Sequence, residues 1–124
     1  MSGQAPQSRG GRADRLGDKQ IGNVGEFAGY GARFRSIYYY DARGLAHIAL
    51  QRRSGNCQEI YRNVLRELGP PIRISNQFLL TLYIWHDRNM HNRIRLMVFE
   101  GVCDLNYERL SDYEAIDLRS ARPD

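Results

Sequence analysis

Imidazole and carboxylate groups gather between His86 and Asn92 of the 124-residue chain. His86, Asp87 and His91 lie within six positions of one another, and imidazole with carboxylate is a ligand set that suits zinc. No third nitrogen or sulfur ligand lies nearby in the sequence, and a hairpin loop is usually too wet for acid–base catalysis. The sequence therefore predicts no catalytic residue, no metal site and no cofactor. A small enzyme of unknown class remains an alternative.

The residues on either side of this loop are of types suited to binding. Tyr83 and Trp85 share one face of a strand when residues are taken in steps of two. The returning strand carries Arg93, Arg95 and Phe99 on one face in the same way. Such residues are enriched in protein–protein contacts, and they also stack on single-stranded nucleic acid. We expect these five residues to form one partner-binding face; the alternative is that a second layer covers Tyr83 and Trp85.

The segments that carry these residues predict a β-hairpin. Residues 78 to 85 and 93 to 100 both alternate with a period of two, which is typical of strands with one buried face. We expect the aliphatic face to be the core. Its members are Phe78, Leu80, Leu82, Ile84, Ile94, Leu96 and Val98.

A helix is predicted over residues 57 to 68. Asn56 with Glu59 three positions later resembles a capping box, and Gly69 followed by two prolines ends the helix. The apolar residues recur with a period of 3.6 and form one stripe. They are Cys57, Ile60, Tyr61, Val64, Leu65 and Leu68. This stripe favours a helix that packs across a sheet.

The remaining pattern completes an α+β domain. Residues 33 to 40 and 45 to 52 predict a first hairpin, and residues 72 to 75 a short strand. We expect a loop at 104 to 109 and a final strand at 113 to 118. The predicted fold is an antiparallel sheet of four to six strands with one packed helix. A small closed barrel with the helix as a lid is the alternative.

The N-terminal region is rich in Gly, Gln, Ser and Arg and has few apolar anchors. We expect residues 1 to 31 to be a disordered or weakly ordered tail, residues 32 to 118 to form one domain, and residues 119 to 124 to be a short polar extension. No apolar run approaches the length of a membrane helix, and no secretory signal is visible. These features favour a soluble, cytoplasmic protein. Cys57 and Cys103 show no C-x-x-C spacing, and we expect both to be reduced.

The chain is basic, with a formal net charge of +4. Lys19 is its only lysine, and all the other basic side chains besides histidine are arginines. Arginines dominate between residues 33 and 95, whereas acidic residues dominate from 100 to 124. In an antiparallel sheet these two regions can pair across strands. We therefore expect mutual neutralisation and only weak, salt-sensitive nucleic-acid binding.

Residues 96 to 102, with Leu105 and the predicted strand at 112 to 118, resemble a pattern in small bacterial β-rich domains, some of which are labelled immunity proteins of polymorphic toxin systems. The likeness rests on Phe99-Glu100-Gly101-Val102 followed by a leucine, and no functional residue is carried over. It implies a toxin-neutralising partner. From the residues themselves we expect a non-enzymatic module that binds another protein or a second copy of itself; RNA or DNA binding is the alternative.

Overall fold

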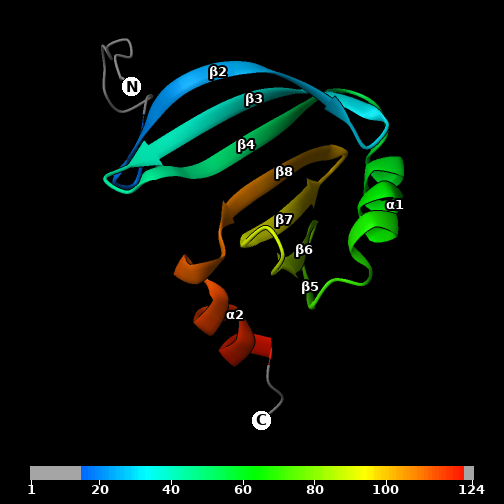
Figure 1. The fold of residues 1–124 in the computed structure, drawn as a ribbon. Helices are drawn as coiled ribbons and strands as arrows, with labels where there is room; N and C mark the ends of the chain where they lie inside the picture. Colours follow the sequence, from blue (N-terminus) through cyan, green and yellow to red (C-terminus); the bar gives the residue numbers. More distant parts are fainter. Residues whose placement is uncertain (1–14, 122–124) are drawn as a thin grey trace.

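One antiparallel sheet organises the computed structural model, which describes residues 15 to 121. Its eight strands run in the order β1-β2-β3-β4-β8-β7-β6-β5, so two four-stranded meanders meet where β4 pairs with β8 (Figure 1). The strands are β1 (Arg15–Leu16), β2 (Lys19–Gly29), β3 (Ala32–Asp41), β4 (Gly44–Ser54), β5 (Arg73–Gln77), β6 (Leu80–Asp87), β7 (Asn92–Phe99) and β8 (Val102–Arg109). The helices are α1 (Cys57–Leu68), the 3-10 turn η2 (Leu110–Asp112) and α2 (Glu114–Ala121).

The predicted antiparallel sheet and the helix at 57 to 68 are confirmed. Asn56 caps α1, since its side-chain oxygen accepts a hydrogen bond from the Glu59 N–H at 3.0 Å. Gly69 ends the helix with φ of +84°, a conformation that favours glycine, and its N–H donates to the Leu65 carbonyl. Both ends of α1 therefore follow from local sequence signals.

The number of strands exceeds the predicted four to six because two segments join the sheet. Residues 15 to 29, assigned from the sequence to a disordered or weakly ordered tail, form β1 and β2; the expectation for residues 1 to 14 lies outside the described residues. β2 pairs with β3 mainly through its backbone, so it needs few apolar side chains; Phe27 and Phe34 provide a ring contact at 6.0 Å. The predicted loop at 104 to 109 is instead part of β8.

The predicted final strand at 113 to 118 is also corrected, because most of it belongs to α2, which continues to Ala121. Asp117 is only 1% exposed and binds Arg93 of β7 from this helix. A buried carboxylate that meets its partner across the fold outweighs the weak strand pattern of Tyr113 to Leu118. This part of the structure depends on a tertiary contact.

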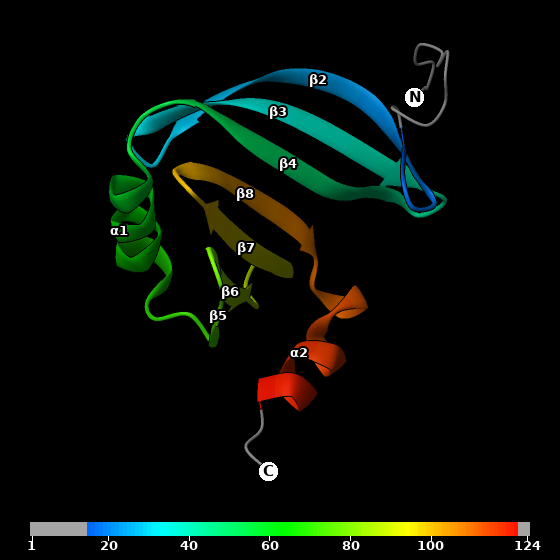
Figure 2. The same cartoon turned by 180° about the vertical axis from the view of Figure 1, so that it is seen from behind.

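The core lies between α1 and one face of the sheet, which we call the inner face. Figures 1 and 2 show β2, β3 and β4 arching over one side, β8 to β5 turning away beneath them, and α1 beside both groups. Ile60 and Val64 of α1 are fully buried in this core. Their buried neighbours from the sheet are Ala32, Phe34, Leu50, Trp85, Ile94, Leu96, Cys103 and Leu105.

The predicted faces of the main hairpin are corrected by this packing. Tyr83 and Trp85 point to the inner face with Ile94 and Leu96, as their cross-strand pairing requires. Residues Leu80, Leu82 and Ile84, expected in the same core as Ile94, lie on the opposite face, which we call the outer face. Ile84 is nevertheless buried there, at 1% exposed. Phe78, another expected core residue, is 98% exposed in the turn between β5 and β6.

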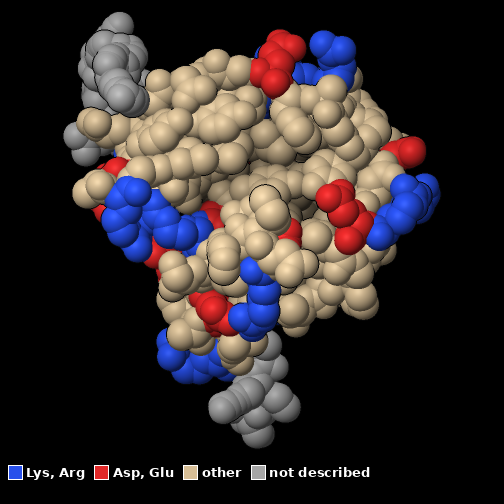
Figure 3. Space-filling view, in the orientation of Figure 1, with Lys and Arg blue, Asp and Glu red and all other residues tan. Residues whose placement is uncertain are grey.

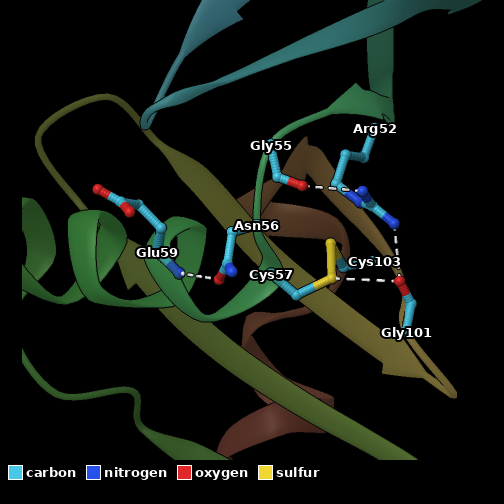
Figure 4. Close-up of a disulfide and its surroundings, with 7 residues drawn as sticks. All are labelled: Arg52, Gly55, Asn56, Cys57, Glu59, Gly101 and Cys103. Atoms are coloured by element: carbon cyan, nitrogen blue, oxygen red, sulfur yellow. Dashed lines mark hydrogen bonds between the residues drawn. A yellow bond between two sulfur atoms is a disulfide. The ribbon is translucent and has the colours of Figure 1, made fainter.

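Cys57 and Cys103 form a disulfide, contrary to the expectation that both are reduced (Figure 4). Their Cα atoms are 6.0 Å apart, because the start of α1 lies against the start of β8. Disulfides persist mainly in oxidising compartments, so this bond does not support the expected cytoplasmic location. In the described part of the chain, no helix is long and apolar enough to cross a membrane.

Replacing both cysteines by serine should lower the free energy of unfolding by about 2–4 kcal/mol, because the bond closes a long loop in the unfolded chain. Urea denaturation of the wild type, of the double variant and of the reduced wild type measures this. The double variant and the reduced wild type should have the same free energy of unfolding. Equal stability of all three proteins, with two free thiols in the purified wild type, would contradict the assignment of the disulfide.

The two faces predict different costs for two aromatic residues of the main hairpin. Trp85→Ala should destabilise the protein by about 3–5 kcal/mol, because Trp85 is only 2% exposed beneath α1. Phe99→Ala should cost less than about 1 kcal/mol, because Phe99 is 46% exposed on the outer face. Thermal and urea unfolding of both variants test the assignment, and the reverse order of costs would show that the faces are inverted.

Candidate functional site

The structure does not bring the five sequence-predicted binding residues together on one face. Tyr83 and Trp85 lie on the inner face, whereas Arg93, Arg95 and Phe99 lie on the outer face. The register explains the division. Trp85 pairs with Ile94 across the turn at residues 88 to 91, so Arg93 is opposite His86 instead.

The inner pair is covered by α1. The Trp85 indole N–H donates a hydrogen bond of 2.8 Å to the Gly69 carbonyl at the end of the helix. The Tyr83 ring stacks on Tyr61 of α1 with 4.2 Å between ring centroids. The alternative interpretation, in which a second layer covers these side chains, describes the position of Trp85, whereas Tyr83 stacks on α1 but stays partly exposed. Trp85 is therefore not available to a partner in this structure.

The two arginines belong to a buried ionic cluster on the outer face. Arg93 binds Asp117 through two hydrogen bonds of 2.6 and 2.8 Å, and it binds Glu108 at 2.7 Å. Arg95 approaches the second oxygen of Glu108 at 2.8 Å. The Tyr113 ring lies 4.5 Å from the Arg93 guanidinium carbon. This cluster attaches α2 and the turn before it to the sheet.

The charges of the cluster stabilise one another. Burial alone would raise the pKa of Asp117, but hydrogen bonds from Arg93 and His86 outweigh it and hold this pKa below its ordinary value of 3.8. Burial opposes ionisation of Glu108 as well, and Arg95 and Arg93 together lower the pKa of Glu108 below 4.5. Both carboxylates are thus charged at neutral pH, as their arginine partners require.

The loop singled out for its imidazoles does not form a site. The His86 ring donates a hydrogen bond of 2.8 Å to the charged Asp117 carboxylate and is only 3% exposed, so a substrate cannot reach it in this structure. Asp87 accepts a bond from the Met90 N–H, and His91 lies exposed in the turn. Within residues 15 to 121, no three His, Cys, Asp or Glu side chains gather as a metal site would require.

Other ion pairs join the basic middle of the chain to its acidic C-terminal third. Arg109 binds Asp41 at 3.0 Å, and Arg43 binds Asp112 at 2.9 Å. The Arg43–Asp112 pair and the pairs of Arg93 and Arg95 confirm the expected neutralisation for these residues, whereas Arg109–Asp41 joins an arginine of the acidic third to a carboxylate of the basic middle. In the view of Figure 3, acidic and basic side chains adjoin one another around a broad uncharged area.

The outer face is apolar at the end away from the ionic cluster. Leu80, Phe99 and Val102 are neighbours across β6, β7 and β8. Phe99 and Val102 are 46% and 57% exposed. In the next row Leu82 and Met97 are partly exposed. Of the five predicted binding residues, Phe99 therefore lies on an accessible apolar surface.

A second exposed apolar group follows β5, the last strand of the sheet. Four large apolar side chains within residues 72 to 79 are exposed. They are Ile72 (39%), Ile74 (52%), Phe78 (98%) and Leu79 (45%). We call the outward edge of β5 with these four residues the β5 edge. Sequence reasoning missed it because Phe78 was assigned to the core; its signal is a short strand after two prolines, with apolar residues in it and on both flanks.

Comparisons with known proteins identify no relative of this chain. No protein-family model, no curated protein and no solved structure matches the chain. The segment 112 to 118, a strand in the resemblance to small bacterial β-rich domains, is mostly helical here. Function is therefore inferred from the surfaces described above.

The ionic cluster predicts loss of stability in acid. The pKa values of Asp117 and Glu108 are lower in the folded than in the unfolded protein, so their contribution is present above pH 4.5 and is lost as the pH falls through the folded values. Asp117→Asn should cost about 3 kcal/mol at pH 7, because it leaves Arg93 buried without one partner, and it should flatten the acid dependence.

Urea unfolding between pH 7 and pH 2 measures both effects. Glu114→Gln is the matched control, because Glu114 lies on the same helix as Asp117 and forms an exposed ion pair with Arg88. Loss of this pair should cost less than about 1 kcal/mol. The Asp41 carboxylate stays charged below the pH at which an ordinary aspartate takes up a proton, because the hydrogen bond from Arg109 lowers its pKa to about 2. Equal costs for the two variants would contradict the role assigned to Asp117.

Proposed function

We propose that the chain is a non-enzymatic protein-interaction module that binds an extended segment of another protein along the β5 edge. The observation that supports this most strongly is the exposure of Phe78, Ile74 and their neighbours beside a terminal strand. Exposed apolar residues are normal when scattered singly, but their concentration in a terminal strand and the residues beside it marks a contact site.

The backbone of β5 supports the choice of an extended partner. One side of β5 pairs with β6, and no strand among the described residues pairs with its other side. Proteins usually protect such edges with charges, prolines or bulges, but Arg73 is the only charged residue in Arg73–Gln77. An added strand would satisfy the outward backbone groups and extend the sheet.

The side chains around β5 suggest how such a segment would be selected. Ile74 lies on the inner side of the sheet, whereas Ser75 and Gln77 lie on its outer side. A partner strand with alternating apolar and polar residues fits this pattern. At the Gln77 end, Phe78 and Phe99 would contact one end of the partner segment.

The alternative functions have less support from the same surfaces. The two arginines of the predicted binding face, Arg93 and Arg95, are engaged with carboxylates and are not free to bind phosphate. Catalysis requires a reachable titrating group, but His86 is buried. A toxin-neutralising protein would be one form of the proposed module, and its toxin would then provide the extended segment.

Ile74→Lys should abolish partner binding, because a lysine at an edge strand disfavours the addition of another strand. Immobilised wild type and variant are compared by capture from extracts of the native source, followed by mass spectrometry. The captured protein is then purified and added back to the wild type. Hydrogen exchange of Arg73–Gln77 should slow in the reconstituted complex.

Ile116→Lys is the matched control, because Ile116 is 50% exposed on α2, about as much as Ile74. Both variants should unfold within about 0.5 kcal/mol of the wild type. A partner that Ile116→Lys retains and Ile74→Lys loses supports the proposal. If Ile74→Lys retains every captured protein, the proposal is wrong. A dimer in light scattering that Ile74→Lys dissociates would assign the edge to a second copy of the chain.

A further inference from the structure

The two sulfur atoms of the disulfide lie in different surroundings. Cys103 is 1% exposed in the core, whereas Cys57, the first residue of α1, is partly exposed. Cys57 also lines a cavity of about 620 Å³, and Cys103 is not among the lining residues. This volume is in the range of small-molecule sites. A small reagent that enters the cavity therefore reaches Cys57 before Cys103.

The cavity has a positive and an aromatic side. Arg52 contributes its guanidinium group, which donates hydrogen bonds to the Gly55 and Gly101 carbonyls at 2.9 and 2.7 Å (Figure 4). Cys57 Sγ lies 3.4 Å from the same Gly101 oxygen, so the arginine and the sulfur are close neighbours. Tyr61 and Tyr83 provide the aromatic side. None of the described residues that line the cavity is acidic.

We propose that the Cys57–Cys103 disulfide is a thiol-exchange site for small thiols that carry a carboxylate, and that Cys57 is the residue that becomes modified. The nearby Arg52 charge and the N-terminal end of α1 both favour an anionic thiol. Tyr83 of the cavity pairs across strands with Ile74 of the β5 edge, so the two sites adjoin, but the exchange does not require the proposed partner.

The exchange replaces one sulfur–sulfur bond with another, so it needs no added oxidant. The thiolate of the small molecule attacks Cys57 Sγ, and a new sulfur–sulfur bond forms as the Cys57–Cys103 bond breaks. The electron pair of the broken bond leaves with Cys103 Sγ as a thiolate, which then takes a proton from water. The products are a mixed disulfide at Cys57 and a free thiol at Cys103.

Exchange would also loosen the start of α1. The disulfide is the covalent link between α1 and β8, and the buried Ile60 and Val64 still hold the helix on the sheet afterwards. We therefore expect the modified protein to remain folded.

The test uses folded wild-type protein with two thiol probes at equal thiolate concentrations, glutathione with carboxylates and cysteamine with an amine. After alkylation of free thiols, peptide mapping by mass spectrometry locates each adduct. We expect the adduct on Cys57 and the alkyl group on Cys103, with a rate proportional to thiol concentration. Glutathione should react about threefold to tenfold faster than cysteamine at low salt.

Arg52→Gln should remove most of the preference for glutathione, whereas Arg53→Gln, a change at an exposed residue that does not line the cavity, should retain it. The wild-type comparison stands by itself if Arg52→Gln does not fold. An adduct on Cys103, a rate independent of thiol concentration, or equal rates for the two thiols in the wild type would overturn the proposal. A rate independent of thiol concentration would show that exchange requires unfolding.

Discussion

Burial of the apolar stripe of α1 against the inner face of the sheet is the constraint on which the rest of the structure depends. It encloses Trp85, and it leaves the other side of β7 and β8 without a helix of comparable apolar character. That side carries Arg93 and Glu108, whose charges can be buried only as pairs. Asp117 of α2 completes the pairing. Because α1 covers the inner face, α2 lies on the outer face, where Asp117 meets Arg93.

Features with local causes could be predicted from the sequence. The ends of α1 follow from Asn56 and Gly69, and the hairpins follow from strands of period two around short turns. The choice of face could not be predicted, because this strand has large apolar residues on both faces. Leu80, Leu82 and Ile84 lie on one face, and Tyr83 and Trp85 lie on the other. The disulfide and the helical state of residues 114 to 121 depend on contacts between distant segments, which local patterns do not contain.

The candidate site shows the same division. The β6–β7 hairpin was predicted correctly as a structural element, but the sequence placed Trp85 and Arg95 on one surface. The β5 edge was missed because an exposed Phe78 and a buried one look alike in an alternating pattern. Only the order of strands shows that β5 is terminal. The proposed binding by strand addition thus rests on topology, which an alternating pattern alone does not determine.

The central claim is that the β5 edge is open in the free protein. Hydrogen exchange at concentrations where light scattering shows a monomer tests it most directly. The account predicts that amides in Arg73–Gln77 exchange orders of magnitude faster than those of β7 and β8, which are paired on both sides. Protection of β5 equal to that of β7 would show that the edge is already covered, and it would contradict the account.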